Sequence, residues 1–272
     1  MNRRAIAALV RRDLTAVFRS RALALPLIVV PIVLSAVVPG LMALLPRFTS
    51  GPGGAAAELE PLLAALPQAI KAELAQYTAE QALIVLLAVY LLAPLFLIVP
   101  FMVSSVIAAD SFAGERERGT LEALLYSPIT DGELFLAKIL VAWLPALLAT
   151  ALGFVTYAVV VNAVAWPEMG RVFFPNAMWF VLILWVAPAV AALGLAGMVF
   201  VSLRVKTVQE AVQLGGLLVV PILALMVGQI RGSMMLGSRA LAVVGLVVWI
   251  VSGAVLLRGV RSFRRTKLIS RA

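Results

Sequence analysis

The chain alternates between long apolar stretches and short polar segments rich in arginine and lysine. Six of the apolar stretches approach or exceed the roughly 20 residues that an α-helix needs to cross the hydrocarbon of a bilayer. They lie near residues 22–45, 82–109, 134–164, 176–201, 211–230 and 240–257. The pattern predicts an all-α, polytopic integral membrane protein with about six transmembrane helices, organised as a single transmembrane domain over residues 1–272.

Composition supports a membrane protein and narrows the chemistry. Hydrophobic residues make up 63% of the chain and charged residues 13%, with a mean hydropathy of +1.09. A soluble domain carries roughly 25% charged residues, so we expect lipid to solvate much of this surface. The absence of Cys and His removes disulfides, thiolate chemistry and the usual zinc sites. We therefore expect no catalytic residue, no metal and no cofactor on this chain, and no enzyme.

The basic residues predict the orientation in the membrane. With a cytoplasmic N-terminus, only five of the 22 Lys and Arg residues fall outside, namely Arg47, Lys71, Arg171, Arg231 and Arg239. The positive-inside rule thus predicts a multi-pass protein of the cell (cytoplasmic or inner) membrane with both termini in the cytoplasm, including a basic tail over 258–272. The membrane topology explains where the basic residues lie, and thus the net charge of +9. The charge therefore does not indicate nucleic-acid binding, and we expect no nucleic-acid partner.

Residues 1–21 are expected to form a helix at the cytoplasmic interface, in contact with membrane lipid. Apolar residues recur there at helical spacing, with the arginines mostly opposite: Ile6, Leu9, Val10, Leu14, Val17 and Phe18. Such a pattern suits a helix that lies in the lipid interface. A basic topology anchor with no further role explains it equally well.

The external loop, 46–81, carries a second amphipathic pattern after its glycines. Apolar residues from Leu59 to Tyr77 predict one or two helices, broken near Pro67. These helices either pack on the rim of the bundle, which is the commoner case, or gate an exit path. The segment from Thr78 to Gln81 predicts a capping box that opens the second span.

The cytoplasmic loop, 110–133, predicts a short coupling helix with its own boundaries. Pro128 stops any helix, because the residue before a proline disfavours helical geometry. A capping box from Thr130 to Glu133 then opens the third span. A short helix with charges and an apolar stripe suits docking into the groove of another protein. The same spacing is equally consistent with a run of charged residues that is exposed to water and only links the two spans.

The run GERERGTLEALL over 114–125, followed by Pro128, resembles the signature of type-2 ABC (ATP-binding cassette) exporter permeases. The segment RVKTVQEAVQL over 204–214 is similar to the second cytoplasmic loop of that family, in its sodium-efflux and multidrug-type branch. The resemblance implies a permease subunit that forms the translocation path, pairs with a second copy or a similar permease, and seats its coupling helix on an ABC ATP-binding subunit. The implied contact residues in the first loop are Glu115, Arg116, Glu117, Arg118, Gly119, Thr120, Leu121, Glu122 and Leu124. Those in the second loop are Lys206, Gln209 and Glu210.

The energy source has to be external if this resemblance holds. A phosphate-binding loop needs a Gly-Lys pair, which the sequence lacks, so ATP and Mg²⁺ are expected on the partner subunit. Ion-coupled carriers usually keep an acid within a span, whereas we place all 13 acidic residues at span ends or in loops, with Asp110 and Glu210 nearest to membrane depth. A secondary transporter, or a membrane scaffold without an ATPase partner, remains the alternative.

Polar residues in the spans are candidates for lining a path, although such residues more often bridge helices. They are Ser104, Ser105, Thr156, Asn162, Gln213 and Gln229. Gly194 and Gly197 permit close helix approach, and Pro94, Pro100 and Pro221 are expected to kink their helices.

Overall fold

The computed structural model describes residues 3–48, 63–64, 66–119, 130–202, 204–205, 207–230 and 237–262. Within these ranges the regular secondary structure is exclusively helical. Six helices are long and apolar enough to span a membrane: Leu27–Phe48, Ala79–Gly114, Gly132–Met169, Ala177–Ser202, Val208–Gly228 and Ser238–Gly259. All six predicted spans are confirmed, with boundaries that differ by a few residues.

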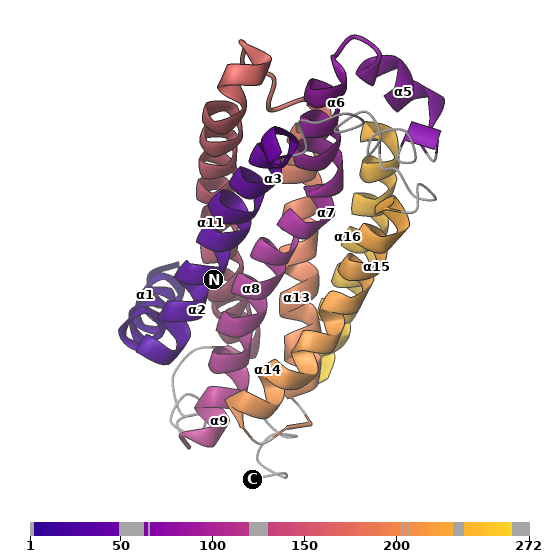
Figure 1. The fold of residues 1–272 in the computed structure, drawn as a ribbon. Coiled ribbons are helices and arrows are strands. Elements are labelled where there is room, and N and C mark those ends of the chain that lie inside the picture. Colours follow the sequence, from indigo (N-terminus) through magenta and orange to yellow (C-terminus); the bar gives the residue numbers. More distant parts are fainter. Residues whose placement is uncertain are drawn as a thin grey trace.

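Most spans are built from several consecutive helical segments. An N-terminal helix, α1, precedes the first span and lies against the side of the bundle (Figure 1). The N-terminal helix α1 covers Arg3–Arg19. The first two spans comprise the following segments: α2 (Arg21–Ile32), η1 (Val33–Val37), α3 (Val38–Phe48), then α6 (Ala79–Val85), η2 (Leu86–Leu91), α7 (Ala93–Phe96), α8 (Ile98–Ala109) and η3 (Asp110–Gly114). The other four comprise α11 (Asp131–Met169), α12 (Ala177–Val181), η4 (Leu182–Val186), α13 (Ala187–Ser202), α14 (Val208–Gly216), η5 (Leu217–Val219), α15 (Val220–Ile230) and α16 (Ser238–Ser262).

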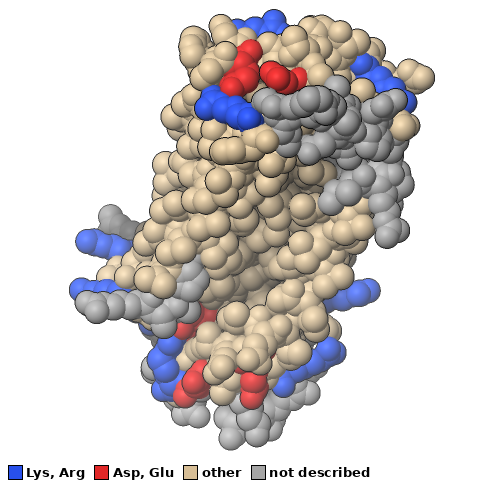
Figure 2. Space-filling view, in the orientation of Figure 1, with Lys and Arg blue, Asp and Glu red and all other residues tan. Residues whose placement is uncertain are grey.

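The bundle has two distinct ends. The short helix α5 (Gln68–Leu74) lies at one end and α9 (Glu115–Glu117) at the other, and we call these the α5 end and the α9 end (Figure 1). Charged side chains gather towards both ends, with a broad uncharged band between them on the face seen in Figure 2. Such a band is the surface that a bilayer requires of a spanning protein.

The second span is the central helix of the molecule. In its most apolar 18-residue stretch 83% of the residues are buried, whereas the corresponding share is 17% in the fifth and in the sixth span. Its segment α8 packs closely on α13, where Gly194 faces the hydroxyls of Ser104 and Ser105. A Cβ on Gly194 would lie 2.8 Å from the backbone oxygen of Phe101, so this approach requires glycine, as the sequence predicts.

The second span departs from regular α-helix near Pro94, and two aromatic side chains form hydrogen bonds to its backbone there. Pro94 has no N–H to donate, and η2 just before it is a π-helix. The side chain of Trp179 donates to the carbonyl oxygen of Val89 at 2.8 Å, and the hydroxyl of Tyr157 donates to that of Ala88. Carbonyl groups that an unbroken α-helix would pair internally are thereby satisfied inside the bundle.

Several local predictions are confirmed at the two ends of the bundle. Both capping boxes are present, with Thr78 and Gln81 opening α6 and Thr130 and Glu133 opening α11. α5 begins directly after Pro67 and buries its apolar side. The predicted pattern before Leu63 lies outside the described residues.

Asn162 has a structural role instead of lining a path. Its side-chain nitrogen donates to the carbonyl oxygens of Ala158 and Phe174 at 2.8 and 2.7 Å, and its oxygen accepts from the backbone nitrogen of Phe173 at 3.0 Å. The amide therefore fixes the turn between α11 and α12, and these contacts use most of its hydrogen-bonding capacity.

We predict that Gly194→Ala destabilises the chain by about 1–3 kcal/mol, because the added methyl group forces α8 and α13 apart. Gly253→Ala in α16 is the matched control, since a Cβ at this position would have no neighbouring atom within 4 Å. The measurement is the melting temperature of the detergent-solubilised chain. Equal melting temperatures for the two variants would show that the α8–α13 contact is not under steric constraint.

Candidate functional site

The predicted coupling loop begins as a direct continuation of the second span. α8 passes without a break into η3 and α9, and the helical run ends at Gly119, whose φ of +67° favours glycine. The first half of the motif is thus rigidly joined to the central helix instead of forming a separate helix. Thr120, Leu121, Glu122 and Leu124 lie outside the described residues, so their contacts stay predictions.

Glu115 lies inside the molecule, paired with a buried lysine from the third span. The side chain of Lys138 is 0% exposed, and its ammonium group donates to the carboxylate of Glu115 and to the carbonyl oxygen of Ser111. The same ammonium group lies 5.1 Å from the centroid of the Phe112 ring. A buried charge requires such partners, because isolated charges are strongly disfavoured in an apolar interior.

The other oxygen of the Glu115 carboxylate is bound by the N-terminal helix. Nη2 of Arg12 lies 3.2 Å from Oε1 of Glu115, and Nε of Arg12 donates to Asp13 at 2.8 Å. Burial raises the pKa of Glu115, while Lys138 and Arg12 act in the opposite direction. We call Arg12, Asp13, Glu115 and Lys138 the charge cluster; it joins α1, the end of the second span and the third span.

A second ion pair lies on the outer side of the same turn. Nη1 of Arg118 donates to Oδ1 of Asp110 at 2.9 Å, and this bond raises the pKa of Arg118. Gly114 lies between the two side chains, and a Cβ there would approach Oδ1 of Asp110 to 2.7 Å. The motif glycine therefore permits the Asp110–Arg118 pair and the contact of η3 with Val208 of α14.

Glu117 connects the two loops that carry the family-like motifs. Its carboxylate accepts a hydrogen bond from the backbone nitrogen of Val208 at 2.9 Å. Val208 is the first residue of α14, which Thr207 caps by accepting from the backbone nitrogen of Glu210 at 3.2 Å. A carboxylate at a helix N-terminus is electrostatically favourable. The two loops therefore form one continuous surface at the α9 end.

The structure divides the predicted contact residues into exposed and buried ones. Those exposed at the α9 end are Glu117, Arg118, Gly119, Gln209 and Glu210. Glu115 is buried instead, because only 5% of this residue is exposed and the charge cluster holds it. Its contact with a partner stays a prediction. The side chain of Arg116 and all of Lys206 lie outside the described part of the chain.

Sequence reasoning missed the ion pairs that Lys138 and Arg12 form with Glu115. Lys138 counts among the basic residues that set topology, although it sits in the apolar run LFLAKILV over 134–141. A lysine amid such a run signals a buried acidic partner, because a charge within a span needs one. Arg12 gives no comparable signal among the other arginines of the N-terminal helix.

Comparison with known proteins identifies one family. The model of the family described as ABC-2 family transporter protein matches residues 53–252, which include both loops of the α9 end. No curated protein matches the chain.

We predict that Lys138→Met destabilises the chain by about 3–5 kcal/mol, because it leaves the Glu115 carboxylate buried without its main cation. The double variant Lys138→Met/Glu115→Leu should recover most of this loss, since it removes both charges at similar volume. Thermal unfolding in detergent measures both effects.

The control for this prediction is Arg12→Gln, which removes the other cation. The side chain of Arg12 is 54% exposed, so we expect a change of about 1 kcal/mol or less. A double variant no more stable than Lys138→Met alone would contradict the pairing of Lys138 with Glu115.

Proposed function

The chain belongs to the ABC-2 family of transporter proteins, as a multi-pass permease component of an ABC transporter, and from this membership we propose that it works as an ATP-driven exporter. In this proposal the α9 end faces the cytoplasm and docks on ATP-binding subunits that are separate polypeptides. The spans form the translocation path.

The hydrogen bond between Glu117 and Val208 is the observation that carries this proposal. It joins two loops that are 91 residues apart in sequence into one surface. That surface contains the described, exposed contact residues of both segments in which the sequence resembles the family. A surface assembled from two loops supports a docking role better than two independent solvated charge runs do.

The second span provides the route by which docking would reach the membrane. No linker separates α8 from η3 and α9, and α8 is packed between α11 and α13. Displacement of the docked loop would therefore move the most buried helix of the bundle. Coupling of this kind requires an element whose position differs between two states, and we assign that role to the second span with the charge cluster.

Two features support a second copy of the permease. In the apolar 18-residue stretches of the fifth and sixth spans only 17% of the residues are buried, so most of these residues keep apolar surface uncovered in the single chain. A groove of about 190 Å³ opens between the second, fourth and fifth spans, and apart from Ser105 every side chain that lines it is apolar. We assign this groove to the path between two copies, which favours hydrophobic or amphipathic cargo.

A secondary, ion-coupled transporter is the second candidate. The buried Lys138–Glu115 pair favours it, because ion-coupled carriers keep ionisable groups inside the membrane. Against it, Glu115 lies just beyond the span Ala79–Gly114, and the charge cluster holds two acidic and two basic side chains. Cargo transport by vesicles that contain this chain, an ion gradient and no ATPase would favour this candidate over the exporter.

We predict that an ATP-binding subunit co-purifies with the chain from its native membrane and that Glu117→Arg weakens this association about tenfold. The charge reversal removes the hydrogen bond to Val208 and opposes the positive end of α14, and bonds to charged groups contribute about 1.5–3 kcal/mol. The measurement is the amount of the subunit, and of its ATPase activity, retained on the tagged permease.

The matched control is Glu80→Arg, which reverses an exposed glutamate at the α5 end. It should leave the association unchanged. A permease that purifies without any ATPase, or a Glu117→Arg variant that retains the subunit as well as Glu80→Arg does, would overturn the docking proposal.

A further inference from the structure

The apolar stripe of α1 is only half covered by the bundle. Ile6, Leu9 and Val17 are buried against the spans, with Asp13 on the same side. The other half of the stripe runs along the outer side of α1 and ends at Phe18, which is 56% exposed. Burying a side chain of this size contributes roughly 1.5–3 kcal/mol, so the uncovered half favours an apolar environment.

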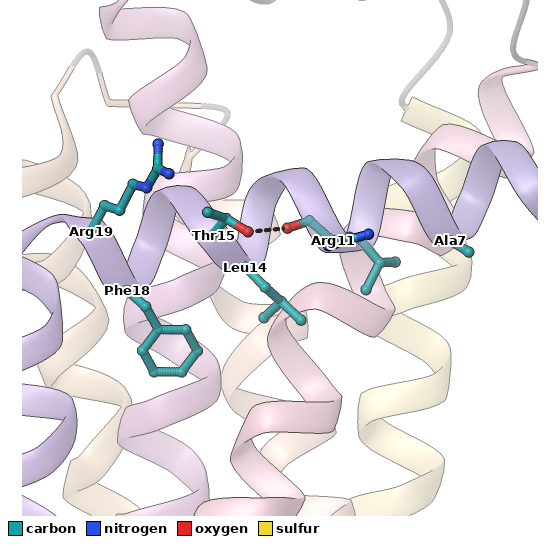
Figure 3. A pocket seen from close by; sticks show the side chains of 7 residues that line it. Ala7, Arg11, Leu14, Thr15, Phe18 and Arg19 are labelled. Atoms are coloured by element: carbon teal, nitrogen blue, oxygen red, sulfur yellow. Dashed lines mark hydrogen bonds between the residues drawn. The ribbon is translucent and has the colours of Figure 1, made fainter.

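The uncovered half forms a groove bordered by arginines. The groove is shallow and wide open, with a volume of about 570 Å³, and its described lining residues all belong to α1, from Ala7 to Arg19. Figure 3 shows Leu14 and Phe18 pointing to one side of the helix and Arg19 to the other, with Arg11 one turn before Thr15. Apolar and cationic groups are thus segregated across one groove, as in helices that bind a lipid interface.

The arginines of the groove, unlike Arg12, have no acidic partner among the described residues. Arg12 is paired with Asp13 and Glu115, whereas the described residues place no acidic group within ion-pair distance of Arg11 or Arg19. Asp13 is the single acidic residue of α1. Two uncompensated cations therefore flank the groove, about 12 Å apart along the helix axis.

The position of α1 presents this groove to the membrane. The contact of Arg12 with Glu115 fixes α1 beside the α9 end of the bundle, next to the start of the first span (Figure 1). The neighbouring side chains Leu25 and Ile28 of α2 are 66% and 53% exposed on the outer surface of that span. The lipid boundary therefore lies within a few turns of Phe18.

We propose that the outer groove of α1 binds an anionic phospholipid of the leaflet at the α9 end. Arg11 and Arg19 hold the negatively charged headgroup, and Leu14 and Phe18 contact the beginning of an acyl chain. Charge complementarity selects an anionic over a zwitterionic headgroup, because each basic side chain near the surface favours anionic lipid. The proposal holds whether or not the chain pairs with an ATPase.

The test uses the absence of Cys from the chain, which lets a single introduced thiol carry a fluorescent label. The full-length Thr15→Cys variant is labelled and placed in nanodiscs that contain brominated phosphatidylglycerol or brominated phosphatidylcholine in an unbrominated phosphatidylcholine background. Bromine quenches only a label that is close to it, so a difference between the two brominated lipids at position 15 reports which headgroup is enriched beside the groove. A Val155→Cys label on α11, at a position that is 59% exposed, reports general contact with lipid.

We expect stronger quenching at position 15 by the brominated anionic lipid and equal quenching at position 155 by both lipids. In the Thr15→Cys background, Arg11→Gln and Arg19→Gln should each weaken the preference for anionic lipid about fivefold. Arg258→Gln, at an exposed arginine near the end of α16, should leave it unchanged.

Equal quenching by the two lipids at position 15 would overturn the proposal, because the groove would then show no headgroup selection. An equal loss of preference in Arg258→Gln would also overturn it, since overall charge would explain the effect. Absence of quenching by either lipid would overturn it as well, because protein, rather than lipid, would then cover the groove.

Discussion

The carboxylate of Glu115 is shared by two cations that come from elements far apart in the sequence, and the α9 end is organised around it. Lys138 reaches it from the third span and Arg12 from the N-terminal helix. Neither the carboxylate nor the ammonium group is stable alone in this apolar surrounding, because desolvation of an isolated charge is costly. The positions of α1, the end of the second span and the start of the third span are therefore interdependent.

The same constraint of satisfying polar groups without water shapes the rest of the bundle. Near the α5 end, Trp179 and Tyr157 bind backbone carbonyls beside the proline break of the second span. In the middle, glycine at 194 permits close approach to two serines. Several polar side chains inside the spans thus hold the chain's own backbone in place, and Asn162 is the clearest case among the residues first considered for a transport path.

The sequence predicted the elements of this fold well because their signals are local. Hydropathy located the six spans, and the spacing of Thr78 to Gln81 and of Thr130 to Glu133 located two helix starts. The partners of Lys138 were not predictable in the same way, since tertiary packing brings Glu115 and Arg12 to it. The inward position of Glu115 was not predicted, although helix geometry makes it intelligible. Glu115 and Glu117 are two residues apart, about 200° around a helix, so only one of them can face solvent while the other faces the bundle.

The π-helical segment η3 decides which of these two glutamates turns inward. A π turn holds about one residue more than an α turn, so it rotates everything beyond it by about 100° relative to a regular helix. If Asp110–Gly114 were regular α-helix, Glu115 and Glu117 would each be turned by about 100° from the directions in which they meet Lys138 and Val208. The extra residue in this turn thus rotates the surface loop about the helix axis relative to the membrane span. This rotation determines which charged side chains of the loop face the bundle and which face outward.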